Sequence, residues 1–226
     1  MNTHATTRPI RLGLIALVAL VSALAALTVS NGPDAHAHDA ASVTDVSAKE
    51  LKLRNDMRVL WEDHVTWTRL AVISLVGGTP DTEATVARLL RNQTDIGNAV
   101  KPFYGKAAGN ALTGELRKHI LIAADVIAAA KAGNKAELTR QQALWQGNAD
   151  DIAALLSKAN PRYWKQPALK AMLLQHLGLT TGEVVARLEK RWADEVAAYD
   201  RVHMHALGMA DALSTGIVKQ FPRRFA

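Results

Sequence analysis

From residue 47 to the end of the chain, apolar side chains recur at intervals of three and four residues. This spacing gathers them on one face of an α-helix, because a helix completes a turn every 3.6 residues. The same region shows no sustained alternation of apolar and polar residues between turn residues, which is the pattern of a half-buried strand. The sequence therefore predicts an all-α fold.

Capping and turn residues divide this region into six predicted helices. The first begins at the capping box Ser47-x-x-Glu50, in which each side chain can satisfy a free amide at the helix start. It ends at Gly77-Gly78, since glycine tolerates the left-handed conformation that follows many helices. Pro102 with Gly105 and Asn134 after Gly133 mark later boundaries. The predicted helices cover residues 47–77, 80–100, 107–132, 134–159, 167–177 and 180–219.

The division between the last two predicted helices depends on one glycine. Gly178 follows residues 167–177, and Thr180-x-x-Glu183 has the form of a second capping box. We therefore expect a short helix followed by a long one. Helices of about 20 to 35 residues joined by short turns favour antiparallel neighbours. The predicted architecture is an antiparallel bundle of four to five long helices plus one short helix.

The beginning of the chain has the composition of an export signal. A largely apolar, uncharged run of eighteen residues, 12–29, follows Arg8 and Arg11. The small-residue sequence at positions 35–37 then suits signal cleavage. The alternative is an uncleaved anchor, because eighteen residues approach the roughly 20 that cross a bilayer.

These features predict an exported protein, periplasmic or extracellular, in three parts. Residues 1–37 form the signal peptide, residues 38–46 a flexible tether, and residues 47–226 a single bundle domain. If the signal is not cleaved, residues 12–29 attach the protein to the membrane, and we expect no other contact with lipid.

Charge and motifs exclude several functions. The net charge is +6, but basic and acidic residues are interleaved, as in 187–195, rather than clustered as a nucleic-acid surface requires. The absence of cysteine excludes disulfides, thiolate metal sites and a cysteine nucleophile. No Gly-x-Ser-x-Gly and no glycine-rich phosphate loop occur. We therefore expect neither a nucleic-acid partner nor nucleotide-dependent or nucleophilic catalysis.

Three predicted helices carry a histidine within their apolar seam. His64 lies in the first and His119 in the third, while the seam of the last runs through Trp192, Val196 and His203. Burying an imidazole without a partner costs free energy, so each needs a hydrogen-bonding group or a metal. In helical bundles, inward side chains from facing helices build such sites together.

This arrangement predicts a shared metal site with neighbouring carboxylates. Imidazole and carboxylate ligands without thiolate suit a divalent transition metal, namely zinc, iron, manganese or copper. The protein would then serve metal storage, sensing or delivery. The predicted ligands are His64, His119, His203, Asp200, Glu62 and Asp63.

The alternative interpretation needs no metal. In it the histidines are core residues satisfied by hydrogen bonds, and the chain is a non-catalytic structural or interaction module with an envelope protein as its partner. His176 is expected to be structural in either case. His205, with Met209 one turn later, offers a weaker copper(I) arrangement. The tryptophans, among them Trp145 and Trp192, are expected to fill the core.

Seven short segments give the chain a resemblance to other proteins. It resembles an uncharacterised family of exported bacterial helical proteins over about residues 53–225. The resemblance implies the same helical fold and brings no established activity with it. The segments are LWEDHVTWTR at 60–69, RNQTDIG from 91, KPFYG at 101–105, HILIAA at 119–124, NADDI at 148–152, AYDRVH at 198–203 and QFP at 220–222.

Overall fold

The structure, a computed structural model, describes residues 46–226. The predicted signal peptide, its cleavage site and most of the predicted tether lie outside the described residues. Within the described range, no helix is both long enough and apolar enough to cross a membrane.

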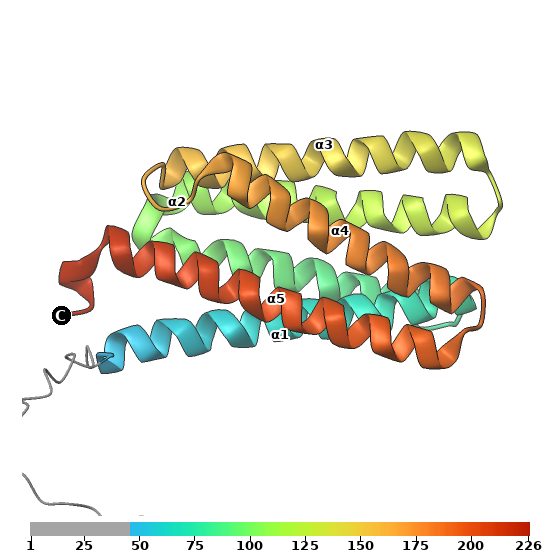
Figure 1. The fold of residues 1–226 in the computed structure, drawn as a ribbon, viewed down its shortest axis with the longest axis horizontal. Helices are drawn as coiled ribbons and strands as arrows, with labels where there is room; N and C mark the ends of the chain where they lie inside the picture. Colours follow the sequence, from blue (N-terminus) through green and yellow to red (C-terminus); the bar gives the residue numbers. More distant parts are fainter. Residues whose placement is uncertain (1–45) are drawn as a thin grey trace, which may run out of the picture. The chain divides into compact units, whose positions relative to one another are not determined.

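Five α-helices and one short 3-10 helix make up the described region, and residues 46–226 contain no strand (Figure 1). The predicted all-α bundle is therefore confirmed. The elements are α1 (Ala48–Gly77), α2 (Thr82–Lys131), α3 (Lys135–Ala159), α4 (Gln166–Leu188), α5 (Trp192–Gln220) and η1 (Pro222–Arg224).

Helix α2 is continuous in sequence but folds back on itself in space. Gly105 has φ 84° and ψ 167°, a conformation open to glycine but not to residues with a Cβ. Leu89 and Ile120 belong to one core cluster, whereas a straight helix would separate them by about 46 Å. We name the two arms α2N (residues 82–104) and α2C (residues 106–131). The break predicted at Pro102 and Gly105 is confirmed.

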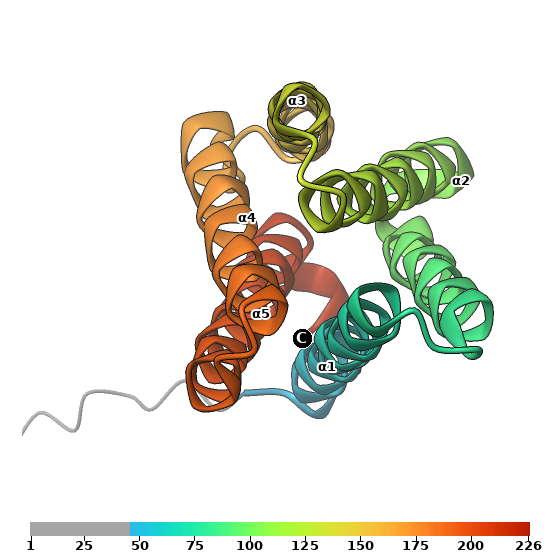
Figure 2. The same ribbon diagram turned by 90° about the vertical axis from the view of Figure 1, so that its right-hand side faces the viewer.

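Six helical rods therefore surround a common interior (Figure 2). Each packs against its neighbour in the chain, and α5 also packs against α1. Two predicted caps help to define the rods. The Ser47 hydroxyl accepts from the Glu50 amide at 3.2 Å, and the Asn134 side chain accepts from the Glu137 amide at 3.1 Å. Free amides at helix starts are satisfied in this way.

The predicted break at Gly178 is wrong. Helix α4 continues through it to Leu188, and Thr180 and Glu183 are buried residues in its interior rather than caps. A glycine inside a helix costs only about 1 kcal/mol relative to alanine, which packing of the apolar face offsets. The chain instead turns after Leu188, where Lys190 has a φ of 59°.

The chain turns after Leu188 and not at Gly178. For this reason the predicted apolar seam of α5 is also wrong in its first half. Trp192 and Val196 are 52% and 51% exposed, while Glu195, Ala198 and Val202 are buried. Residue spacing predicts a shared face only within one continuous helix. Counting from residues of α4 across the turn into α5 therefore assigned the wrong residues to the buried face.

The loop between α3 and α4 packs on α5 at a glycine. A Cβ built on Gly216 would lie 1.9 Å from the Trp164 Nε1 atom, so this contact excludes every larger residue. The Asn160 side chain also donates to the Gly216 carbonyl oxygen at 2.9 Å. The loop is thereby fixed against the last helix.

Gly216→Ala is expected to lower the free energy of unfolding by about 1–3 kcal/mol, because the added methyl overlaps a buried indole. Urea denaturation measures this change. Gly208→Ala, on the same helix with open space around the new Cβ, is the matched control and should be neutral or raise stability by up to about 1 kcal/mol. Equal stability of the two variants would contradict the packing described.

Candidate functional site

Four helices bring histidine side chains together in the middle of the bundle. His176 on α4 is central, with its ring centroid 5.8 Å from that of His64, 6.5 Å from His119 and 6.0 Å from His205. His64, His119 and His176 are buried, and His205 is partly buried. We call these four residues the histidine layer.

Hydrogen bonds occupy both nitrogens of His119. Its Nδ1 lies 2.8 Å from the Asn148 Oδ1 atom, and the Trp145 indole donates to its Nε2 at 3.1 Å. An amide oxygen only accepts and an indole N–H only donates, so the ring is neutral with its proton on Nδ1. The Asn148 amide is oriented in turn by its own donation to a Glu115 carboxylate oxygen at 2.8 Å.

The other histidines of the layer are satisfied less completely. His64 Nδ1 lies 3.3 Å from Gln93 Nε2, which also donates to the Leu89 carbonyl at 2.8 Å. His205 Nε2 donates to the Met172 carbonyl oxygen at 3.0 Å. His176 Nδ1 is buried and has no hydrogen-bond partner among the described residues.

Burial keeps His64, His119 and His176 neutral. It lowers the pKa of His64 to about 4, with the nearby His119 lowering it further, and it lowers the pKa of His119 to about 4. The pKa of His176 is well below its ordinary value for the same reason, and three neighbouring imidazoles add to the effect. The buried imidazoles are therefore uncharged at neutral pH.

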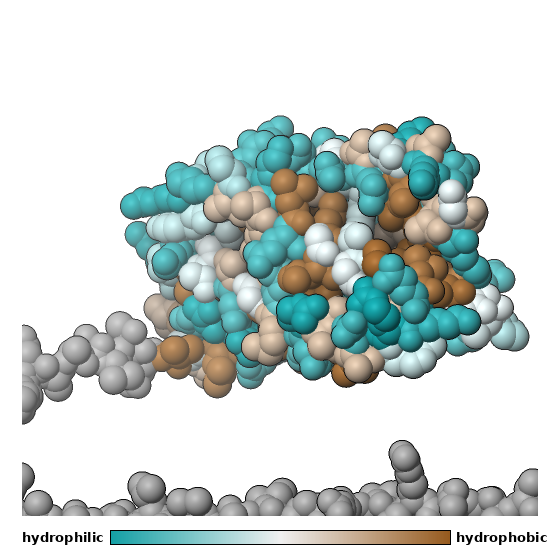
Figure 3. Space-filling model, turned by 45° about the vertical axis from the view of Figure 1, so that its right-hand side comes forward, coloured by the Kyte–Doolittle hydropathy of each residue, from teal (hydrophilic) through white to brown (hydrophobic). Residues whose placement is uncertain are grey.

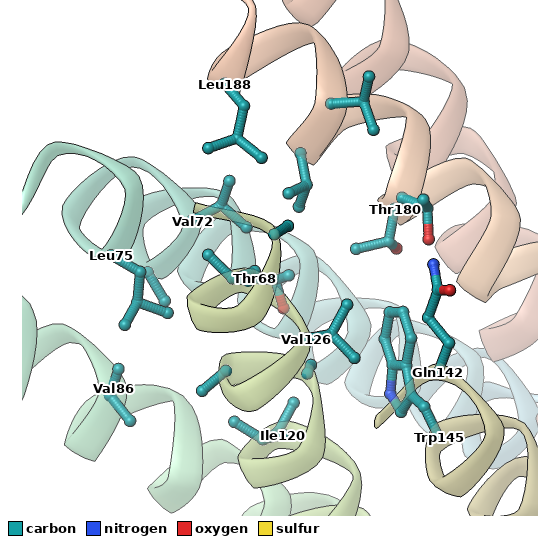
Figure 4. Close-up of a pocket in the computed structure, with 18 of the residues that line it drawn as sticks. Thr68, Val72, Leu75, Val86, Ile120, Val126, Gln142, Trp145, Thr180 and Leu188 are labelled. Atoms are coloured by element: carbon teal, nitrogen blue, oxygen red, sulfur yellow. The ribbon is translucent and has the colours of Figure 1, made fainter. Parts of the chain in front are cut away.

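An apolar cavity lies beside the histidine layer, between α1, both arms of α2, α3 and α4 (Figure 4). A water-sized sphere can occupy about 90 Å³ of it, so the cavity is smaller than a typical site for a drug-sized molecule. Alanine, valine, leucine and isoleucine form most of its wall, as at Val72, Ile120 and Val126. Among the described residues that line it, none carries a charge.

Two lining residues, Trp145 and Thr180, place the cavity next to the histidine layer. Trp145 lines the cavity and donates its indole proton to His119. Thr180, another lining residue, follows His176 by one turn of α4. The layer is thus a polar boundary between the cavity and the main apolar core, which on α1 includes Met57.

The cavity is not fully enclosed. Val185 on α4 lines it and is 38% exposed. Hydrophobic side chains also gather among hydrophilic ones on the face of this end of the bundle (Figure 3).

A buried charged network lies further along α4. Arg69 contacts Glu183 at 3.1 Å and Glu195 at 2.9 Å, and Arg187 contacts Glu195 at 3.3 Å. The Arg69 guanidinium also lies 4.5 Å from the centroid of the Tyr199 ring. Burial raises the pKa of Glu183 to about 7 despite the adjacent arginine. The network joins α1, α4 and α5 by paired charges.

The structure separates the six predicted metal ligands. His64 and His119 both lie in the histidine layer, but His203 lies near the surface, where its Nε2 is 2.7 Å from a Glu62 carboxylate oxygen. Within residues 46–226, no group of three or more histidine, aspartate or glutamate side chains is placed to hold an ion.

The remaining two predicted ligands are also apart from the layer. Asp63 pairs with Arg88 at 2.5 Å, and Asp200 is exposed. In addition, His119 could coordinate a metal only by losing one of its hydrogen bonds. Metal binding by these residues stays a prediction.

Sequence reasoning missed the polar side chains of α4. His176, Thr180, Glu183 and Arg187 are spaced by four, three and four residues, which puts them on one face of a continuous helix. The predicted break at Gly178 divided this pattern between two helices. The spacing of these four residues was the signal from which the sequence could have predicted a polar face on one helix.

No protein-family model, curated protein or solved structure matches the chain. The resemblance to an exported helical family is thus neither supported nor contradicted.

The titration of His64 and His119 is expected to have midpoints near pH 4 rather than near 6.5, because burial disfavours the charged rings. Imidazole ¹⁵N NMR between pH 7 and 4 measures this directly. At pH 6, His119 should show the pattern of the neutral Nδ1–H tautomer. Midpoints near 6.5 would contradict the buried, hydrogen-bonded layer.

The same shifts predict that stability falls as the pH is lowered from about 6.5 towards 4. Over this interval the unfolded chain gains protons on histidines that the folded protein keeps neutral. Glu183 acts in the opposite direction, since its pKa is raised to about 7 and its folded form gains a proton first. Urea denaturation in a Glu183→Gln background should therefore show a steeper loss of stability than in the wild type.

Proposed function

We propose that this protein binds a small apolar molecule in the cavity between α1, α2, α3 and α4. The observation that carries the proposal is the hydrocarbon lining of this cavity, which has space for a small molecule only. Protein interiors are close-packed, and a cavity lined by apolar side chains lowers stability when empty. Such a space binds apolar molecules rather than water.

Binding accounts for the site better than catalysis does. The polar side chains that line the cavity are those of threonines, Gln142 and Trp145, with no carboxylate, amine or imidazole among the described lining residues. General acid–base catalysis requires such a group within reach of the substrate. Together with the export signal expected at the N-terminus, this supports a binding or carrier protein of the cell envelope.

Filling the cavity should abolish binding. Ala124→Phe places a ring in the space beside α2C and is expected to weaken binding of benzene, used as a small apolar probe, at least tenfold, because the probe and the ring compete for one volume. Isothermal titration calorimetry measures the affinity.

Ala128→Phe is the matched control, since Ala128 is one turn further along α2C, exposed, and outside the cavity lining. It should bind the probe as the wild type does. Absence of saturable binding to the wild type, or equal binding by Ala124→Phe and the wild type, would overturn the proposal.

Binding of a transition metal is the second candidate function. The observation in its favour is the free Nδ1 of His176, next to three other imidazoles. Two imidazoles bound to one ion at about 2.0–2.1 Å have centroids about 5–6 Å apart, and His64 and His176 are 5.8 Å apart.

Isothermal titration of the protein with zinc, and separately with nickel, tests this candidate. Stoichiometric binding that His176→Leu removes and His203→Gln retains is expected if the histidine layer holds the ion, because His203 lies outside it. If His203→Gln removes the binding instead, the ion is bound at the surface pair of His203 and Glu62.

A further inference from the structure

Thr180 presents an unsatisfied hydroxyl in the wall of the cavity. The residue is 4% exposed, and its Oγ1 has no hydrogen-bond partner among the described residues. Threonines in helices commonly donate to the carbonyl four residues earlier. Thr181 does so, with its hydroxyl 2.8 Å from the Leu177 carbonyl oxygen. Thr180 is therefore exceptional beside its own neighbour.

A buried hydroxyl without a partner costs free energy, and folded proteins rarely retain one. The main-chain environment does not explain it, because the adjacent Thr181 satisfies its hydroxyl within the same helix. Since Thr180 lines the cavity, a bound molecule is in position to supply the missing partner.

Most polar side chains of the cavity are gathered at one end, whereas Thr68 lies nearer its middle and already donates its hydroxyl to the His64 carbonyl oxygen at 2.7 Å. Figure 4 shows Thr180, Gln142 and Trp145 together at this end, with Leu75 and Val86 at the other. The Trp145 indole proton is already donated to His119, so it is not free for a ligand. Gln142 is partly buried, and its side chain makes no hydrogen bond with the rest of the described chain. The polar end thus offers one hydroxyl and one amide.

The charge of the surroundings limits the ligand further. No charged side chain lines the cavity within the described part of the chain, so a carboxylate or phosphate inside it would lose water without gaining a counter-ion.

We propose that the ligand is an uncharged, mainly hydrocarbon molecule with one hydroxyl or carbonyl oxygen, which hydrogen-bonds to Thr180 while its apolar part extends toward Leu75 and Val86. This inference rests on the proposed function of the cavity. It makes Thr180 the residue that distinguishes an oxygen-bearing ligand from a plain hydrocarbon.

The test uses ligands of one chain length and different end groups. Pentane, 1-pentanol, 2-pentanone and pentanoate compete with benzene for the full-length protein, its Thr180→Val variant and its Thr181→Val variant. Valine keeps the shape of threonine and removes the hydroxyl. Thr181→Val is the matched control, because Thr181 lines the same cavity with a hydroxyl already satisfied by its helix.

For the wild type, 1-pentanol and 2-pentanone should bind about tenfold more tightly than pentane, and pentanoate should bind more weakly than 1-pentanol. Thr180→Val should remove the advantage of the alcohol and the ketone and leave the affinity for pentane unchanged. Thr181→Val should preserve the wild-type order. The ligand-free Thr180→Val variant should also unfold at an equal or higher temperature, because it no longer buries an unsatisfied hydroxyl.

The outcomes separate this inference from the proposed function. If none of the four compounds displaces the probe, or the probe does not bind, the cavity is not a ligand site and both fail. If pentane binds as tightly as 1-pentanol, or Thr180→Val keeps the preference for oxygen, the cavity binds apolar molecules but Thr180 does not select them. If pentanoate binds more tightly than 1-pentanol, only the inference that the ligand is uncharged is overturned.

Discussion

The hydrogen bonds of His119 hold the centre of this bundle together. One ring nitrogen faces Asn148 and the other accepts from Trp145, so a single side chain of α2C is fixed to two positions on α3. A buried polar group keeps its low free energy only in an arrangement that preserves its partners. The pairing therefore sets how these two helices are aligned, and it orients the tryptophan that forms part of the cavity wall.

Much of the fold was accessible from sequence because its signals are local. The capping residues Ser47 and Asn134 and the break at Gly105 act within a few residues of where they stand, and the structure confirms each of them. The boundary near Lys190 has no such signal, since a lysine with positive φ is imposed by the packing of the helices it joins. The error at Gly178 followed from reading a tolerated glycine as a helix end.

The candidate site was accessible only in part. An apolar seam predicts that His64 and His119 point inward, and both are buried. It does not predict His176 as the centre of the histidine layer, because that depends on how α4 meets three other helices. No pattern in the sequence predicts the cavity. It is a volume that side chains such as Leu75 and Leu188 leave unfilled, and its existence depends on the angles between helices.

The reversal of α2 at Gly105 makes the bundle a closed circuit. Successive rods pack together, α5 returns to α1 through pairs such as Arg58 with Asp211, and the Lys49 ammonium donates to the Ala226 carbonyl oxygen at 2.9 Å. The two ends of the folded region therefore meet. No rod is structurally first, so a circular permutant opened at the exposed turn around Gly133 would keep every interhelical contact. Chains that begin at different turns of this ring would therefore place the same helices side by side.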